Sequence, residues 1–320
     1  MSGGGNLVWV RVLRVTGMGP DQGVLQVALY KYVSAGTALR ILMGSIKFTQ
    51  PGAFNDPFEL LPQFIIPADI EEKERGFSFC VMSPRRKGID RSHIPGPEEH
   101  RSDIQARKFV KSLNQSLGIL CLSRNPDSLL MWGHYAQDYT GAIIEFDESH
   151  EFFKGLNPVK YQKRRPVFNI EDFFDRHVPI ADLCVKSNVW SYEREVRLVR
   201  SLSDCKVTDS EAPKFPIVTM DLPRESIKTV YIGERMSIEN QRMIWDLVKS
   251  TDIELSLAAI ANWDYAFRYE PIKFKGPLVG SPAISPRTAH IFKDEGGQLG
   301  ELARWAIEQH PMSEFVNHKC

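Results

Sequence analysis

The stretch DSLLMWGHYAQDYTGAIIEF, residues 127–146, predicts a helix followed at once by a strand. Asp127 or Ser128 is suited to cap the helix, because either side chain can accept a hydrogen bond from the first free backbone N–H groups. The helix is expected to run to about Tyr139, and the apolar run over residues 142–146 predicts a buried strand. The stretch therefore indicates a domain in which helices pack closely against strands.

Beyond this stretch, helices and strands follow one another without the regular strand–helix–strand alternation of a parallel α/β fold. The spacing of apolar residues predicts strands over residues 27–33, 46–49, 119–122, 192–200, 215–220, 227–232 and 253–259, and helices over 34–42, 104–117, 171–185 and 238–248. Neither GxGxxG nor GxxxxGKS/T occurs, so neither a dinucleotide-binding Rossmann site nor a P-loop is supported. We predict an α+β fold with mixed or antiparallel sheets and packed helices.

The predicted domain organisation has one core and two flanking parts. Residues 27–272 form a single α+β core, which carries a polar insertion at about residues 84–103. Residues 1–26 are expected to be an N-terminal extension. Residues 273–320 begin with a Pro/Gly-rich linker and continue as a helical tail.

Composition places the chain among ordinary globular proteins. Of its 320 residues, 42% are hydrophobic and 25% are charged, and 40 Lys and Arg balance 40 Asp and Glu. No apolar run is long enough to span a bilayer, so we expect no membrane partner. The five cysteines are widely spaced and show no zinc or disulfide pattern, which favours a reducing cytoplasm and no metal.

The first candidate cluster is Leu29-Tyr30-Lys31-Tyr32. In a strand, Tyr30 and Tyr32 share one face and Lys31 points to the other. The two rings are suited to stack on a planar ligand, and Lys31 to bind an anion. Core packing of the tyrosines beside a solvated lysine is an equally good interpretation.

The second cluster is Phe54-Asn55-Asp56-Pro57-Phe58-Glu59. Asn and Asp before Pro favour a fixed turn in which their side chains bond the neighbouring backbone. Either Asn55 and Asp56 serve only this turn, or the loop presents Asn55, Asp56 and Glu59 to a ligand.

The third cluster, Met131-Trp132-Gly133-His134-Tyr135, lies on the predicted helix of residues 127–139. Trp132 and Tyr135 share a helix face. A histidine side chain such as that of His134 is suited to donate a hydrogen bond to a phosphate or hydroxyl group. A histidine with a purely structural role is the alternative.

The fourth cluster is Tyr192-Glu193-Arg194-Glu195-Val196-Arg197. On the predicted strand, Glu193, Glu195 and Arg197 would line one face. Carboxylates of this kind bind ribose hydroxyls and stabilise the oxocarbenium ion of glycosyl transfer, and Arg197 would hold one of them ionised. A solvated edge face would have the same pattern.

Taken in order, these clusters resemble the bacterial domain-of-unknown-function family 2971 (DUF2971). The resemblance covers roughly Leu29 to Pro271. It rests on LYKY, FNDPFE, MWGHYA, GAIIEFD, VKYQ, YEREVR and VYIG, at residues 29–32, 54–59, 131–136, 141–147, 159–162, 192–197 and 230–233.

A more distant resemblance is to ADP-ribosyltransferase-like toxins and RNA 2′-phosphotransferases, which have a split sheet. It implies that Glu195 is the catalytic carboxylate and that Glu193 orients or deprotonates the acceptor. It also implies that Lys31 and His134 bind phosphate or ribose of NAD and that Tyr32 and Tyr135 stack on its nicotinamide. Asn55, Asp56 and Arg197 would complete the NAD site.

The family of unknown function implies no activity, but the more distant resemblance implies one, and two alternatives remain. The implied function is an NAD-dependent ADP-ribosyltransferase or NAD glycohydrolase that acts on a protein or nucleic-acid acceptor, in phage defence or as a toxin. The first alternative is a non-catalytic ligand-sensing or nucleic-acid-interaction module, with a basic run interleaved with aromatic residues: Lys160, Tyr161, Lys163, Arg164, Arg165 and Phe168. The second is a metal-dependent nuclease with Asp56, Glu59, Glu193 and Glu195 as ligands.

Overall fold

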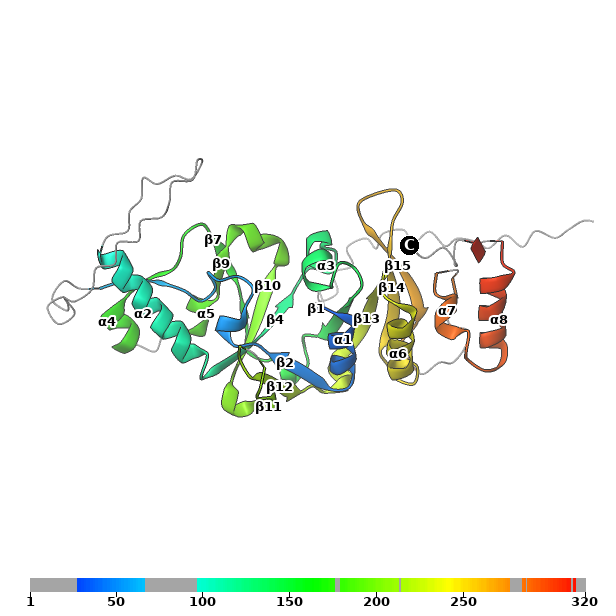
Figure 1. Ribbon diagram of the computed structural model, residues 1–320, viewed down its shortest axis with the longest axis horizontal. Coiled ribbons are helices and arrows are strands. Elements are labelled where there is room, and N and C mark those ends of the chain that lie inside the picture. The colour runs from blue at the N-terminus through cyan, green and yellow to red at the C-terminus, as the bar shows by residue number, and fades with distance from the viewer. Residues whose placement is uncertain are drawn as a thin grey trace, which may run out of the picture.

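An eight-stranded sheet runs through the molecule in the order β15-β14-β13-β5-β1-β4-β10-β6 (Figure 1). The computed structural model describes residues 28–66, 97–175, 179–212, 214–276, 284–285, 287–311 and 313–314. The strands are β1 (Ala28–Val33), β4 (Leu117–Ser123), β5 (Ala142–Asp147), β6 (Leu156–Pro158), β10 (Glu195–Ser201), β13 (Ile227–Gly233), β14 (Glu254–Ile260) and β15 (Phe267–Lys273). All neighbours are antiparallel except β13 and β14. The predicted α+β fold is confirmed.

The sheet is nearly divided between β1 and β4. Every residue of β1 pairs with β5, and every residue of β4 pairs with β10. Between β1 and β4, however, the only paired residues are Tyr30 and Ser123. Because the two strands diverge from this point, side chains from both enter the space between them.

Three smaller sheets, eight α-helices and five short 3₁₀-helices complete the described structure. The small sheets are β11 (Lys206–Asp209), β12 (Ile217–Asp221) and β2 (Ser45–Phe48); β3 (Gln63–Ile65) with β8 (Val167–Asn169); and β7 (Lys160–Gln162) with β9 (Val185–Ser187). The helices are α1 (Ala35–Leu42), α2 (Pro97–Leu113), α3 (Leu129–Tyr135), α4 (Ile170–Asp175), α5 (Ile180–Leu183), α6 (Ile238–Val248), α7 (Ala289–Phe292) and α8 (Gly297–Glu308).

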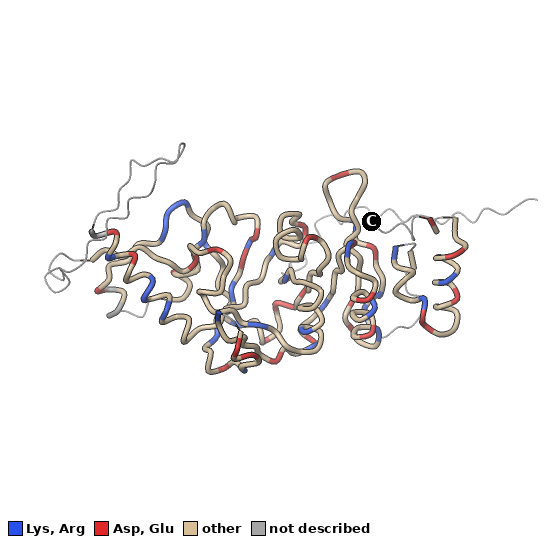
Figure 2. The backbone as a smooth tube through the Cα atoms, viewed as in Figure 1, with Lys and Arg blue, Asp and Glu red and all other residues tan. Residues whose placement is uncertain are grey.

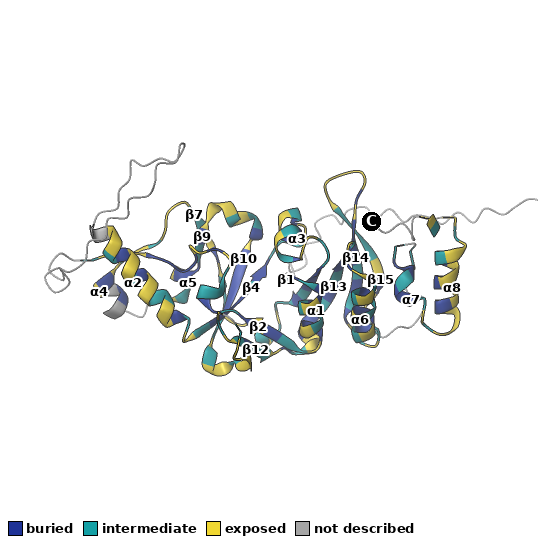
Figure 3. Ribbon diagram, in the orientation of Figure 1, coloured by how far each residue is buried: buried dark blue, intermediate teal, exposed yellow. Residues whose placement is uncertain are grey.

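The two faces of the sheet bury different side chains, as strand alternation requires. On one face, Leu29 packs with the apolar residues of α1 and α6 in the main core. On the other face, Tyr32 packs with Trp132 of α3 in an aromatic cluster. Tyr30 also lies against this second cluster, so the predicted shared face of Tyr30 and Tyr32 is correct. Figure 3 shows the buried central strands.

The helix of residues 127–139 is shorter than predicted. Ser128 caps α3, since its Oγ accepts a hydrogen bond from the backbone N–H of Met131 at 3.3 Å. The helix ends at Tyr135 because Gln137, Asp138 and Tyr139 have positive φ angles of 50°, 53° and 68°. These left-handed residues turn the chain into β5.

Two other helix predictions are wrong in their bounds. Residues 171–185 hold two short helices, α4 and α5, and then enter β9, instead of one long helix. Helix α2 begins at Pro97, so residues 97–103 of the predicted polar insertion are helical; residues 84–96 lie outside the described residues.

The C-terminal helices pack onto the sheet's helical layer. The rings of Trp245 on α6 and Phe292 on α7 are 4.8 Å apart, and Trp245 Nε1 donates to Glu295 Oε1 at 2.7 Å. The part of 273–320 that carries α7 and α8 is therefore tied to the core instead of forming a loose tail. The predicted extension, residues 1–26, lies outside the described residues. Where the structure describes helices, none is long and apolar enough to cross a membrane.

Candidate functional site

A cavity of about 180 Å³ lies at the division between β1 and β4. Tyr30 and Ser123, the pair that joins the two strands, both line it. Six of the nine residues proposed from the sequence also line this cavity: Lys31, Tyr32, Asn55, Tyr135, Glu193 and Glu195. Segments far apart in the sequence thus converge at one place.

Side chains of β1 bridge the gap to β4 where the backbone does not. Lys31 Nζ donates to the backbone oxygen of Cys121 at 2.9 Å, and Tyr32 Oη donates to that of Asn125 at 2.8 Å. Burial lowers the pKa of Lys31 and raises the pKa of Tyr32. Lys31 is therefore buried, which excludes the solvated lysine of the structural interpretation, and it lies on the wall of the cavity.

Lys186 of β9 is the centre of a buried charge cluster beside the cavity. Its Nζ lies 2.6 Å from Glu193 Oε2, 3.0 Å from Glu59 Oε1 and 3.2 Å from Glu195 Oε2. Its pKa is set by burial, which lowers it, and by Glu195 and Glu59, which outweigh burial and raise it. Lys186 is therefore fully charged at neutral pH.

Arg197 of β10 is the second cation of the cluster. Its side chain is 0% exposed, its Nε donates to Glu195 Oε1 at 2.7 Å, and its Nη2 bonds Glu59. The ring of Phe54 covers the guanidinium at 5.4 Å. Nη1 has no hydrogen-bond partner among the described residues. The prediction that Glu195 and Arg197 share a strand face is correct, but β10 lies inside the sheet and this face is buried, not a solvated edge.

The two carboxyl groups bound to Arg197 differ in acidity. Burial raises the pKa of Glu195, but the charge and hydrogen bond of Arg197 outweigh it, with help from Lys186, and lower the pKa to about 2. For Glu59, burial has the larger effect and its pKa is raised despite Arg197 and Lys186. Glu195 is therefore the carboxylate that stays ionised, and Glu59 takes up a proton more readily.

This difference predicts how the free energy of unfolding changes with pH. Because the pKa of Glu195 is depressed from 4.5 to about 2, Glu195 stabilises the fold above pH 4.5, by about 3 kcal/mol, and this is lost as the pH falls towards 2. The pKa of Glu59 is raised, so its effect on the free energy of unfolding has the opposite sign: the buried Glu59 carboxylate destabilises the fold at neutral pH, and protonation at lower pH removes that destabilisation. Urea unfolding between pH 7 and pH 2 should show a steeper acid loss in the wild type than in Glu195→Gln; parallel curves would contradict the assignment.

Glu193 reaches the cavity by a different route from that predicted. It ends the 3₁₀-helix η4 (Asn188–Glu193), and Arg194 after it has a positive φ of 45°, so Glu193 is not on the strand with Glu195. Tyr135 Oη donates to Glu193 Oε1 at 2.6 Å and accepts from Asn55 Nδ2 at 3.3 Å. These bonds hold the Tyr135 ring against the cavity.

Three proposed site residues do not line this cavity: Arg197, which lies beside it in the charge cluster, His134 and Asp56. His134 is exposed, with its ring 6.4 Å from that of Trp190 and 6.2 Å from that of Tyr135. Asp56 is buried, and its Oδ1 accepts a hydrogen bond from the backbone N–H of Phe58 at 2.9 Å. Asp56 therefore serves the turn, which was the structural alternative for this loop.

Sequence reasoning missed Lys186, and it gave Glu59 a role only as a residue that its loop presents to a ligand or as a metal ligand. Lys186 follows the predicted helix of residues 171–185 and belongs to no motif. It reaches the cavity because β9 pairs with β7, and this pairing is not predictable from local sequence. Tyr161 of β7 was proposed as a stacking residue, but its Oη accepts a hydrogen bond from the backbone N–H of Glu195 at 2.8 Å. It supports the start of β10.

The arrangement does not favour metal chemistry. The carboxylates of Glu59, Glu193 and Glu195 are bound to Lys186 and Arg197, which occupy the place that a metal ion would take. Over the described part of the chain, no group of three or more His, Cys, Asp or Glu residues is arranged to hold a metal. Neither observation supports the metal-dependent nuclease alternative for these residues.

A cysteine nucleophile is also disfavoured. Cys121 lines the cavity, but burial raises the pKa of its thiol well above the ordinary value. A thiol, unlike a thiolate, is a weak nucleophile. The site is instead suited to hold an ionised carboxylate, together with tyrosine rings, against a ligand that develops positive charge.

Comparison with known proteins gives one match, which covers part of this site. No curated protein and no solved structure matches the chain, so no comparison supports a similarity to ADP-ribosyltransferases. Over residues 131–198 the chain matches the model of the family described as protein of unknown function (DUF2971). This region runs from α3 to β10 and contains Tyr135, Lys186, Glu193, Glu195 and Arg197.

Proposed function

We propose that the chain is an NAD-dependent ADP-ribosyltransferase or NAD glycohydrolase, and that the cavity between β1 and β4 binds the nicotinamide riboside end of NAD. The observation that carries the proposal is Glu195: an ionised carboxylate on the wall of a cavity, fixed by Arg197 and Lys186. Glycosyl transfer needs a carboxylate at the ribose, and the aromatic rings that line the same cavity suit a nicotinamide ring.

The proposed reaction breaks the glycosidic bond between ribose C1′ and the nicotinamide nitrogen. Nicotinamide leaves with the electron pair of that bond, and positive charge develops on the ribose. The Glu195 carboxylate stabilises this charge and accepts a hydrogen bond from a ribose hydroxyl. An acceptor, or water in the glycohydrolase reaction, then bonds to C1′ and gives up a proton, for which Glu193 is the proposed base.

Aromatic side chains supply the recognition of the nicotinamide ring. Tyr30, Tyr32, Phe54 and Tyr135 all line the cavity. At about 180 Å³ the cavity is smaller than a site that encloses a drug-sized ligand, which takes about 300–1,000 Å³. We therefore assign only the nicotinamide riboside end to it, and the diphosphate and adenosine to the surface outside.

The setting proposed for this reaction is the cytoplasm. Cys121, Cys184 and Cys205 are free thiols, as a reducing compartment favours. Loss of NAD or modification of an essential macromolecule would stop growth, so the proposed role is in phage defence or as a toxin.

Nicotinamide release from NAD by the purified chain tests the proposal. We expect release, and we expect Tyr135→Leu to raise the KM for NAD about tenfold because the ring that stacks on nicotinamide is lost. Tyr135→Phe, which keeps the ring, should have a smaller effect. Tyr265→Leu is the matched control, since Tyr265 is 94% exposed on a loop away from the cavity.

Two negative outcomes have different meanings. A chain that releases no nicotinamide and whose melting temperature NAD does not raise has no NAD site, and the proposal is then wrong. A chain that is stabilised by NAD without turnover would be the ligand-sensing module of the alternative.

A further inference from the structure

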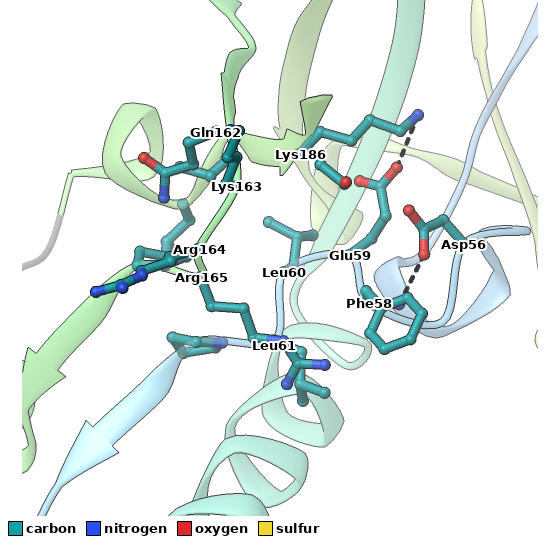
Figure 4. Close-up of a pocket in the computed structure, with 15 residues that line it drawn as sticks. Asp56, Phe58, Glu59, Leu60, Leu61, Gln162, Lys163, Arg164, Arg165 and Lys186 are labelled. Carbon is teal, nitrogen blue, oxygen red and sulfur yellow. Dashed lines mark hydrogen bonds and ion pairs between the residues drawn. The ribbon is translucent and has the colours of Figure 1, made fainter. Parts of the chain in front are cut away.

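A second cavity, of about 250 Å³, lies on the other side of the ion pair between Glu59 and Lys186 (Figure 4). These two residues line both cavities. The second cavity is bounded by the segment from Asp56 to Pro62 and by residues 162–166, which lead from β7 to β8. A ligand held here would lie next to the cavity proposed for NAD.

One wall of this second cavity is strongly basic. Lys163, Arg164 and Arg165 are consecutive and exposed, and all three line it. Figure 2 shows them as a run of positive charge in the loop between β7 and β8. Within the described residues, none of the three forms an ion pair. By contrast, Lys160 on the same segment lies 3.3 Å from Asp182.

The basic wall also carries an exposed aromatic ring. Phe58 lines the cavity, is 63% exposed, and has the Arg165 guanidinium over its ring at 5.1 Å. Phe168, the stacking residue suggested by the sequence, instead packs in the core 5.3 Å from Phe173. The exposed aromatic beside the basic run is therefore Phe58.

We propose that this basic cavity binds a single-stranded nucleic acid, and, resting on the proposed function, that the nucleic acid is the acceptor of ADP-ribose. Unpaired cations bind the phosphates, and Phe58 stacks on one base; such a combination is typical of single-strand binding. A hollow of this size suits a base that has turned out of a strand better than it suits a flat membrane surface.

The transfer step is balanced with the groups named. A nucleophilic oxygen or nitrogen of the bound nucleotide forms a bond to ribose C1′ as the bond to nicotinamide breaks. Nicotinamide keeps the electron pair of the broken bond, and the proton of the acceptor passes to a carboxylate. Glu59 and Glu193 both line the NAD cavity, and Glu59 also faces the basic cavity.

Binding is tested first, without NAD, by fluorescence anisotropy with labelled single-stranded RNA and DNA of about 12 nucleotides. For three phosphate contacts, log K should fall with log salt concentration with a slope of about −2. Arg164→Gln with Arg165→Gln should weaken binding at least about tenfold and reduce the slope to about −0.7. Phe58→Ala should weaken binding about tenfold with the slope unchanged.

Lys160→Gln is the matched control, because it removes a charge from the same segment that is already paired with Asp182. It should leave affinity and slope unchanged. No binding, or binding that the arginine substitutions do not weaken, would overturn the proposal. If Lys160→Gln reduces the salt slope per removed charge as much as the arginine substitutions do, the proposal is also overturned, because the effect would then come from net charge and not from the basic cavity.

The acceptor role is tested with NAD labelled in its adenylate phosphate. Label on the oligonucleotide, lost in the double arginine variant, supports the proposal. Label on protein from a lysate, with the oligonucleotide unlabelled, overturns it while leaving the proposed function intact. Oligonucleotide binding without any nicotinamide release refutes the proposed function and the acceptor role together, and leaves a nucleic-acid-binding surface.

Discussion

Replacing Glu195 by glutamine is expected to lower nicotinamide release about a hundred- to a thousandfold. The amide has almost the shape of the carboxylate but no charge, so it cannot stabilise the positive ribose of the transition state. The pKa of about 2 means that the wild-type side chain is ionised throughout the neutral range, so this loss should not depend on pH between 6 and 8. The rate at saturating NAD is the quantity to measure.

Glu270→Gln is the matched control for Glu195→Gln. Glu270 of β15 accepts hydrogen bonds from Arg268 and Ser285, so its loss also breaks an ion pair on the central sheet, but Glu270 lines neither of the two cavities described above. It should leave the release rate unchanged. Melting temperatures of both variants separate a catalytic loss from unfolding. A folded Glu195→Gln variant with the wild-type rate would refute the proposed mechanism.

Replacing Arg197 by methionine is expected to lower the free energy of unfolding by about 3–5 kcal/mol. Arg197 is 0% exposed and binds both Glu59 and Glu195. Without Arg197, the carboxylates of Glu59 and Glu195 remain buried and share the single positive charge of Lys186. The cost arises from the uncompensated charges left behind, not from the net value of the ion pair. Urea unfolding measures it.

Two further variants separate that cost from a general effect of losing an arginine. Arg107→Met removes an exposed partner of Asp103 on α2 and should cost less than about 0.5 kcal/mol. Adding Glu195→Gln to Arg197→Met should restore part of the lost stability, because one of the stranded charges is removed. If the double variant is less stable than Arg197→Met alone, packing and not charge explains the loss.

Local signals in the sequence predicted much of the fold. Helix α6 has the predicted bounds, residues 238–248, because Ser237 caps it and its apolar residues recur with helical spacing. Strand β5 was predicted to within one residue from an apolar run. In both segments the decisive interactions are made by residues close together in the sequence. The helix over 127–139 failed because three consecutive left-handed residues end it, and no residue type there demands that conformation.

The candidate site was only partly predictable, for a related reason. Strand alternation was enough to place Glu195 and Arg197 on one face, and motif resemblance singled out Tyr135. Lys186 binds three glutamates, yet its place depends on a strand pairing between β7 and β9 that no local pattern encodes. Burial raises the pKa of Glu59, and at Glu195 burial is outweighed by the nearby charges of Arg197 and Lys186, which lower the pKa. These surroundings exist only in the folded molecule, so the sequence could not predict the two pKa changes.

The central position of β1 determines when the cavity can form during synthesis. Lys31 bonds Cys121, 90 residues later in the chain, and Tyr32 bonds Asn125, 93 residues later. At about 5–20 residues per second, the ribosome makes β1 roughly 5–20 s before these partners exist. The nascent strand must wait with both edges unpaired and then insert between β5 and β4. Strand β1 therefore waits for partners that are made later in the chain, and the cavity between β1 and β4 is completed only when the two halves of the sheet are joined.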